Sequence, residues 1–157
     1  MLWFIGLGIS GISELSNSTL EVIKNAEIVY LESFTSPISD TEKKQLEDIS
    51  GGEFKTAKRW LVEDGNEILE NAKNRETVLI SYGDPYIATT HLELKTRAIR
   101  DDIETRTIHS SSIVSSLIGE VGLHYYKVGK VLTIMNDPKS MITPYNTIFE
   151  NLLGKTH

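Results

Sequence analysis

The sequence predicts an α/β fold in which a mostly parallel sheet carries helices on both faces. Short, uninterrupted apolar runs at residues 2–5, 28–31 and 77–80 are typical of parallel strands that are buried on both sides. Segments with helical spacing of apolar residues separate these runs, and Gly, Pro or Asn stands where the pattern changes. With 157 residues, the chain has the length of one domain and can bury a core of its own.

Composition narrows the classes of function. The net charge of −6 argues against non-specific binding of nucleic acid, because few cations are present to displace counterions from phosphate. The chain has no cysteine, which excludes disulfides and thiolate metal sites. No apolar stretch approaches the ~20 residues of a membrane span, and the N-terminus lacks a secretion signal. We therefore expect a cytoplasmic protein with no membrane contact, whose macromolecular partner is a protein.

The first strand, residues 2–5, runs into a glycine-rich loop. Gly6, Gly8 and Gly11 form the pattern G-x-G-x-x-G, and Glu32 ends the second strand, where a dinucleotide fold places its ribose-binding acid. An NAD-dependent oxidoreductase is therefore one alternative.

The expected start of the first helix weakens this alternative. In dinucleotide-binding folds the helix opens on the glycine loop, so that the pyrophosphate lies at the helix N-terminus. Here the predicted N-cap is Asn17 or Ser18, with Glu21 completing a capping box. We interpret the glycines as positions where the backbone approaches a ligand, and we expect no nicotinamide dinucleotide to bind.

The second strand, residues 28–31, is followed by a proline-containing loop at residues 34–37. This loop is either a simple connection or a second wall of the same cleft. Residues 40–49 form a predicted helix with Ser39 or Asp40 as its cap, and residues 54–57 form a weak third strand. Apolar spacing from residue 60 to residue 72 predicts one further helix with acidic residues on its outer face.

The central strand, residues 77–80, ends in Gly83-Asp84-Pro85. These three residues favour a tight turn, and by itself this is ordinary turn chemistry. Thr89 or Thr90 then caps a predicted helix through residues 92–99. In an open parallel sheet, ligands bind at the carboxyl ends of strands, so the Asp84 carboxylate is well placed to meet a small molecule.

The last third of the sequence predicts a fifth strand at residues 103–108, followed by a serine-rich helix start at residues 109–113. A further strand at residues 130–135 and an amphipathic helix at residues 145–153 complete the predicted elements. The four histidines lack the close spacing of metal ligands, so we expect no metal site.

Three strand ends of the predicted sheet converge on one crevice, and their residues resemble a known family. The motifs are Phe4-Ile5-Gly6-Leu7-Gly8-Ile9, Gly83-Asp84-Pro85 with Ala88-Thr89-Thr90-His91, and Ile108-His109 with Ser112-Ile113. Together they resemble the S-adenosylmethionine-dependent tetrapyrrole methylase superfamily. Thr89-Thr90-His91, residues 32–36 and residues 122–129 are most similar to its diphthine synthase branch.

The resemblance implies a methyltransferase that uses S-adenosyl-L-methionine. In that branch, methyl groups are transferred to the amino group of a 3-amino-3-carboxypropyl histidine on translation elongation factor 2, in diphthamide biosynthesis. The positions that match the family's cofactor contacts are Ile9, Asp84, Ile87, Ser112 and Ile113. The proline that usually precedes the matching serine is Ser111 here, which indicates a looser loop. We assign no catalytic base.

The resemblance also implies a domain organisation. We expect residues 1–157 to form the N-terminal, cofactor-binding domain of a tetrapyrrole methylase-like fold, without the second α/β domain that closes over the cofactor in this family. We expect a homodimer. Three alternatives remain open: another methyltransferase of the same superfamily, the NAD-dependent oxidoreductase, and a folded fragment without activity.

Overall fold

The computed structural model describes residues 1–36, 38–129, 131, 146, 149–150 and 153. The chain divides into two compact units, Met1–Ile113 and Val114–His157. The first unit holds the whole sheet. The second begins within α6 (Ile113–Glu120) and includes the short 3₁₀ helix η2 (Tyr125–Lys127).

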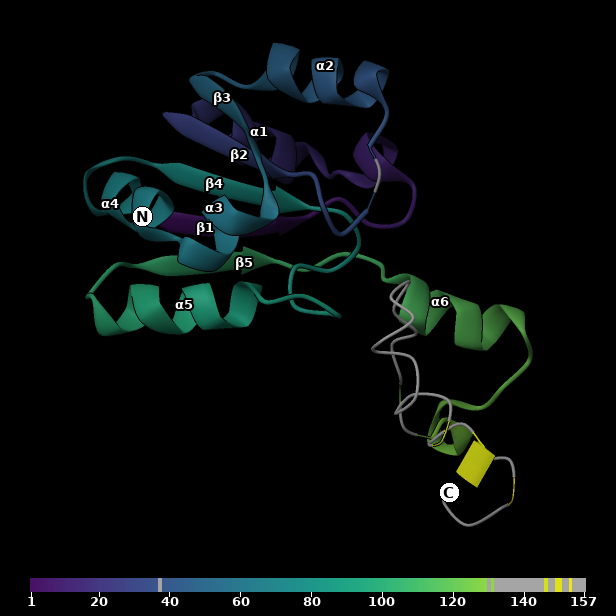
Figure 1. The fold of residues 1–157 in the computed structure, drawn as a ribbon. Coiled ribbons are helices and arrows are strands. Elements are labelled where there is room, and N and C mark those ends of the chain that lie inside the picture. Colours follow the sequence, from purple (N-terminus) through teal and green to yellow (C-terminus); the bar gives the residue numbers. More distant parts are fainter. Residues whose placement is uncertain (37, 130, 132–145, 147–148, 151–152, 154–157) are drawn as a thin grey trace. The chain divides into compact units, whose positions relative to one another are not determined.

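Five parallel strands form the sheet, in the order β3-β2-β4-β1-β5 (Figure 1). Their bounds are β1 (Leu2–Gly6), β2 (Ile28–Glu32), β3 (Glu53–Ala57), β4 (Thr77–Ser81) and β5 (Thr105–Ile108). Because every pair is parallel, all five carboxyl ends lie at the same edge. The predicted fold class is confirmed, and the uninterrupted apolar runs are the strands β1, β2 and β4 at the middle of the sheet.

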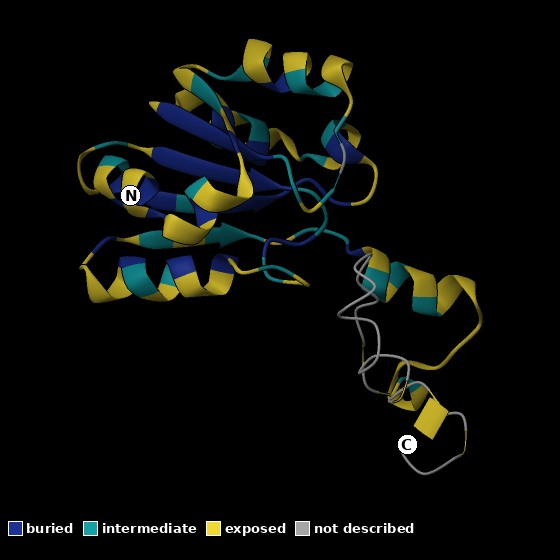
Figure 2. Ribbon diagram, viewed as in Figure 1, coloured by how far each residue is buried: buried dark blue, intermediate teal, exposed yellow. Residues whose placement is uncertain are grey.

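Helices cover both faces of the sheet, as predicted. One face packs against α1 (Asn17–Asn25) and α2 (Asp40–Ile49), with the 3₁₀ turn η1 (Gly11–Glu14) nearby. The other packs against α3 (Arg59–Asp64), α4 (Asn66–Asn74) and α5 (His91–Arg100). Figure 2 shows the consequence: the strands β2 and β4 are buried along their whole length, while the helices keep an exposed outer side.

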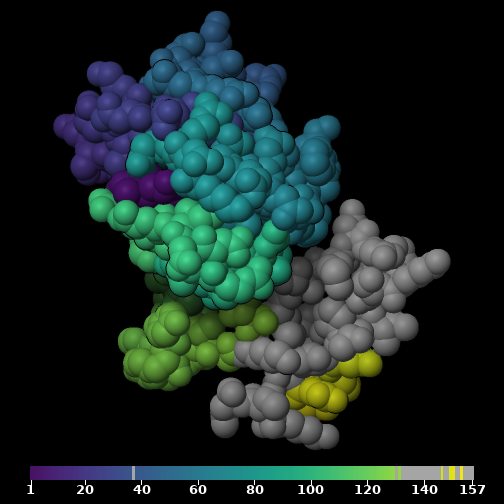
Figure 3. Space-filling view, turned by 90° about the vertical axis from the view of Figure 1, so that its left-hand side faces the viewer, coloured from purple at the N-terminus to yellow at the C-terminus, as the bar shows by residue number. Residues whose placement is uncertain are grey.

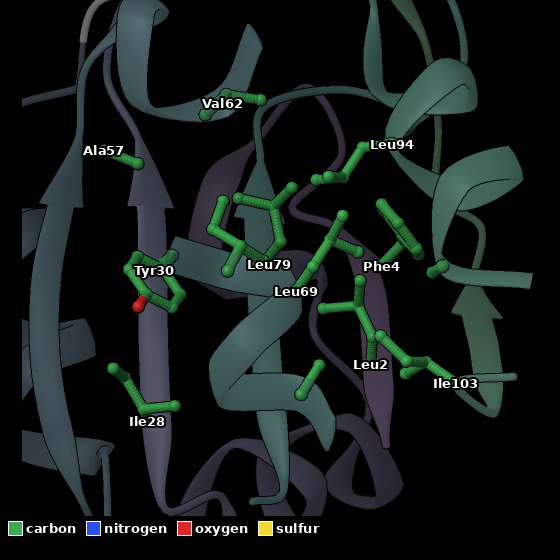
Figure 4. Packing of buried hydrophobic residues seen from close by; sticks show 13 residues of the cluster. Leu2, Phe4, Ile28, Tyr30, Ala57, Val62, Leu69, Leu79, Leu94 and Ile103 are labelled. Carbon is green, nitrogen blue, oxygen red and sulfur yellow. The ribbon is translucent and has the colours of Figure 1, made fainter. Parts of the chain in front are cut away.

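Each face has its own apolar cluster, because side chains alternate along a strand. On the α3–α5 face, Phe4, Tyr30 and Leu79 from three adjacent strands meet Leu69 of α4 and Leu94 of α5 (Figure 4). The opposite cluster contains the intervening strand residues together with side chains from α1 and α2.

The N-terminus is fixed at the amino edge of the sheet. The Met1 ammonium donates to the carbonyl oxygens of Ala72 (2.8 Å) and Arg75 (3.2 Å). Figure 3 shows the first residues, in purple, recessed between later segments of the chain. This anchor fixes the start of β1, and the strand then runs to the opposite edge.

Two local predictions are wrong. The cap of α1 is Ser16, whose Oγ accepts from the backbone N–H of Thr19, rather than Asn17 or Ser18. The helix predicted over residues 60–72 is two helices, α3 and α4, because Gly65 adopts a left-handed conformation (φ 66°) that ends the first. Because the apolar periodicity continues across Gly65, the sequence pattern did not reveal the break between the two helices.

Other boundaries differ little from those predicted. Ser39 caps α2 through a bond from the Glu42 N–H, and Thr90 occupies the N-cap of α5 without a side-chain bond. The strand β5 begins at Thr105, two residues after the predicted start. The strand predicted at residues 130–135 and the helix at residues 145–153 fall largely outside the described residues.

Candidate functional site

Three loops meet at the carboxyl edge of the sheet, within the unit Met1–Ile113. They are residues 7–10, 82–90 and 109–112, called here the strand-end loops; they follow the adjacent strands β1, β4 and β5. Gly8 and Gly83 exchange two backbone hydrogen bonds, of 3.2 and 3.0 Å. The Ile9 N–H donates to Ser111 Oγ at 3.0 Å. The predicted convergence of these loops is confirmed.

Gly6 is the point around which the loops close. A Cβ at this position would lie 2.4 Å from the Gly83 carbonyl oxygen and 3.0 Å from both Pro85 Cδ and Ser110 Cβ. The last residue of β1 therefore contacts both neighbouring loops at once. Only glycine leaves room for this approach.

Asp84 supplies a buried carboxylate to the site, with only 8% of the residue exposed. Its Oδ1 accepts from the Tyr86 N–H at 3.0 Å, and its Oδ2 lies 2.7 Å from His109 Nδ1. His109 follows β5 directly, and its side chain is 66% exposed. In the sequence, His109 belongs to the Ile108-His109 motif, and its position directly after a predicted strand is the signal that places it beside Asp84.

Tyr86 anchors the second strand-end loop to the core. Its hydroxyl lies 2.6 Å from Thr107 Oγ1 on β5, and its ring packs against Phe4 with centroids 5.6 Å apart. The Lys95 ammonium lies 4.9 Å from the centroid of the Tyr86 ring. These contacts hold the loop that presents Asp84.

The five predicted contact residues fall into two groups by exposure. Asp84 and Ser112 are buried, whereas Ile9, Ile87 and Ile113 are 45%, 42% and 61% exposed. Each strand-end loop thus presents one exposed isoleucine in it or directly after it. Because these side chains are about half exposed, covering the rest of each with an apolar ligand would be worth about 1–2 kcal/mol, part of the value for full burial.

A second tie between loops involves Glu14 and Ser111, called here the Glu14–Ser111 clasp. Ser111 Oγ donates to Glu14 Oε2 at 2.5 Å, and the Ser10 N–H donates to Glu14 Oε1 at 2.8 Å. Ser111 Oγ also accepts the Ile9 N–H, so one hydroxyl joins the first loop to the third. Proline at this position could make neither bond, so Ser111 adds two side-chain ties to the loop that its presence led us to expect to be looser.

The clasp should depend on pH. The hydrogen bond from Ser111, and then those from Ser10, hold the pKa of Glu14 below its ordinary value of 4.5. A lowered carboxylate pKa gives stabilisation that is complete above the ordinary value and lost as the pH falls through the lowered one. At pH 7 the amides of Ile9 and Ser10 should be better protected from exchange in the parent chain than in Glu14→Gln, and the difference should shrink as the pH falls below 4.5. Equal protection at pH 7 would show that the clasp does not form.

Glu32 does not extend toward a ribose. Its Oε1 accepts from the N–H groups of Phe34 (2.8 Å) and Thr35 (2.5 Å), so the carboxylate folds back on its own loop. The glycine loop leads into η1, and α1 begins only at Asn17. Both observations argue against the dinucleotide alternative.

A cavity of about 230 Å³ lies elsewhere, against α1 and the amino halves of β1 and β4. Trp3, Val22 and Val78 contribute to its lining, and it includes none of the five predicted contact residues. In the part of the chain that the structure describes, no helix has the length and apolar character needed to cross a membrane.

Taken together, these observations define a parallel α/β domain whose candidate site lies on loops at the carboxyl ends of the strands. Residues 1–154 match the sequence profile of the tetrapyrrole (corrin/porphyrin) methylases. The chain belongs to this family.

Individual relatives point to one branch of the family. The chain is 39% identical to a diphthine synthase of Methanospirillum hungatei JF-1, over all of this chain and 64% of the relative. It is 36% identical to a diphthine methyl ester synthase of Candida glabrata, over 96% of this chain and 51% of the relative. A crystal structure of diphthine synthase matches 94% of this chain and 60% of its own, with 33% identity and a TM-score of 0.77. The chain spans about three fifths of the archaeal relatives' length.

Proposed function

We propose that this chain is the cofactor-binding part of an S-adenosylmethionine-dependent methyltransferase with the activity of diphthine synthases. The observation that carries the proposal is the joining of three strand-end loops around the buried Asp84 carboxylate, in a member of the tetrapyrrole methylase family. The proposed substrate is the 3-amino-3-carboxypropyl histidine of translation elongation factor 2. On the same resemblance to diphthine synthases, we propose that the protein acts in the cytoplasm and forms a homodimer.

The residues present fit the chemical groups of S-adenosylmethionine. A carboxylate oxygen has two lone pairs. Asp84 can therefore accept a hydrogen bond from the ligand's ammonium group while it keeps its hydrogen bonds with the Tyr86 N–H and His109 Nδ1. Charge-assisted bonds of this kind are the strong ones, and burial reduces competition from water. The exposed Ile9, Ile87 and Ile113 offer apolar surface for an adenine ring.

The proposed reaction requires mainly that the amine of the substrate and the methyl group of S-adenosylmethionine be held close together and aligned. When bound, S-adenosylmethionine would supply the methyl group of its sulfonium: an unprotonated amine of the substrate would form a bond to the methyl carbon as the carbon–sulfur bond breaks, with S-adenosylhomocysteine as the leaving group. Such a step needs no covalent intermediate with the protein, and alignment of the two reactants supplies most of the acceleration. The rigid joining of the strand-end loops meets this need, because bonds between the loops fix Asp84 and Ile9 relative to each other.

Ile87 offers a direct test of the apolar contact. Ile87→Ser should weaken binding of S-adenosylhomocysteine by about 1–2 kcal/mol, since the side chain loses the area that it would bury against the ligand. Its thermal stability should change little, because the residue is 42% exposed. Ile99→Ser is the matched control, since Ile99 is 57% exposed on α5. Equal loss of affinity in both variants would contradict the placement.

Two measurements test the proposed function. Thermal unfolding should shift upward with S-adenosylhomocysteine and remain unchanged with NADH, because only a ligand that binds the folded state stabilises it. The reverse result would support the oxidoreductase alternative. Labelled methyl groups should reach elongation factor 2 that carries the modified histidine and not the unmodified factor; labelling of a tetrapyrrole acceptor instead would assign the chain to another branch.

A further inference from the structure

A layer of buried polar side chains lies directly beneath the strand-end loops. Glu32 and Ser81, the last residues of β2 and β4, are each 3% exposed, and His91, the first residue of α5, is fully buried. Alternation along the strands places Glu32 and Ser81 on the same face as Tyr30 and Leu79, which is the face that α5 covers. These polar groups therefore end one apolar cluster at the edge where the loops begin.

The hydrogen bond of His91 determines which nitrogen of its imidazole ring carries the hydrogen. Its Nδ1 lies 3.0 Å from the carbonyl oxygen of Pro85, and because a carbonyl only accepts, Nδ1 carries the hydrogen. Its Nε2 is buried and has no hydrogen-bond partner among the described residues. Burial lowers the pKa of His91, although the nearby Glu32 carboxylate opposes the shift. The ring is therefore neutral, with its hydrogen on Nδ1.

The bond from His91 closes a strained segment. The main chain between Pro85 and His91 contains Ala88 with φ of 58°, a left-handed conformation that non-glycine residues rarely adopt. Strain of this kind persists when surrounding contacts hold it. His91 supplies such a contact from below, at the residue that follows Asp84.

We propose that His91 is a positioning residue of the strand-end site. As the neutral Nδ1–H tautomer, it holds the Pro85 carbonyl and thereby sets the loop that presents Asp84 and Ile87. Glu32 acts in the same layer on the neighbouring loop, where its carboxylate accepts from Phe34 and Thr35. The role in ligand binding rests on the proposed function, whereas the role in loop geometry does not.

The tautomer can be observed in the unmodified protein. Imidazole ¹⁵N–¹H correlation spectra at pH 7.5 should show a hydrogen on Nδ1 of His91 and a bare Nε2, with the signals assigned by their loss in His91→Phe. A hydrogen on Nε2, or on both nitrogens, would overturn the proposal. This measurement needs no ligand.

Two variants separate the hydrogen bond from the volume of the ring. His91→Phe keeps a planar ring without a donor, and His91→Asn restores an N–H near the position of Nδ1. Amide exchange of Tyr86, whose N–H donates to Asp84 Oδ1, should be about tenfold faster in His91→Phe, as expected for the loss of about one hydrogen bond. His91→Asn should recover most of the protection. Unchanged exchange in His91→Phe, or no recovery in His91→Asn, would contradict the proposal.

Ligand affinity is the third test of the proposed role of His91. The affinity for S-adenosylhomocysteine should fall about tenfold in His91→Phe and recover in His91→Asn, by the same reasoning. Ile99, 57% exposed on the same helix as His91, supplies the control variant Ile99→Ser, which should change neither readout. If the parent chain binds no S-adenosylhomocysteine, the proposed function fails, while the tautomer and the exchange of Tyr86 still decide the role of His91.

Discussion

Replacing Gly6 with alanine should weaken both folding and ligand binding. The added Cβ would lie 2.4 Å from the Gly83 carbonyl oxygen, which is backbone and cannot turn away as a flexible side chain would. Forcing a methyl group into such a space typically costs about 1–3 kcal/mol and shifts the backbone. Because Gly6 contacts both neighbouring loops, the shift separates the groups that we propose bind the ligand. Chemical denaturation and calorimetric titration with S-adenosylhomocysteine measure the two effects.

Gly119→Ala is the matched control for this prediction. Gly119 lies in α6, and a Cβ there would meet no atom of the described residues within 4 Å. Alanine in a helix interior is favoured over glycine by about 0.5–1 kcal/mol, so this variant should be as stable as the parent or slightly more stable. If Gly6→Ala matched it in stability and affinity, the close approach at Gly6 would be irrelevant to the site.

Asparagine in place of Asp84 should separate affinity from stability. The amide keeps the shape and turn preference of the carboxylate, and its oxygen can still accept from the Tyr86 N–H. It loses the negative charge that we propose pairs with the ligand's ammonium group. Losing a charged partner typically costs about 1–3 kcal/mol, or about 5- to 150-fold in affinity.

His109→Asn tests the same carboxylate from the other side. His109 is mostly exposed, so its replacement should leave the fold intact while it removes the 2.7 Å contact with Asp84 Oδ2. We expect a smaller loss of affinity than in Asp84→Asn, because the charge of Asp84 remains. If Asp84→Asn unfolded the protein without changing the affinity of the residual folded fraction, Gly83-Asp84-Pro85 would be a turn and nothing more.

The sheet could be predicted from the sequence because its signals are local. Residues 2–5, 28–31 and 77–80 are apolar without interruption, and turn residues bound them, which is the pattern of strands buried on both faces. Parallel strands bring their carboxyl ends to one edge, so the meeting of the three loops followed from topology. Among the described residues, the errors fell in the helices: Ser16 caps α1, and the left-handed Gly65 divides one predicted helix into α3 and α4.

The links within the site could not be predicted in the same way. The pairing of Asp84 with His109 spans 25 residues and that of Ser111 with Glu14 spans 97, and neither leaves a periodic trace in the sequence. The hydrogen on His91 Nδ1 depends on the position of one carbonyl oxygen. Such contacts are set by how the chain packs in three dimensions.

The central claim is that the strand-end loops around Asp84 bind S-adenosylmethionine, and calorimetric titration with S-adenosylhomocysteine tests it most directly. The account predicts saturable one-site binding that Asp84→Asn and Gly6→Ala weaken and that Gly119→Ala and Ile99→Ser leave unchanged. Absence of binding to the parent chain, or equal affinity in all four variants, would contradict it.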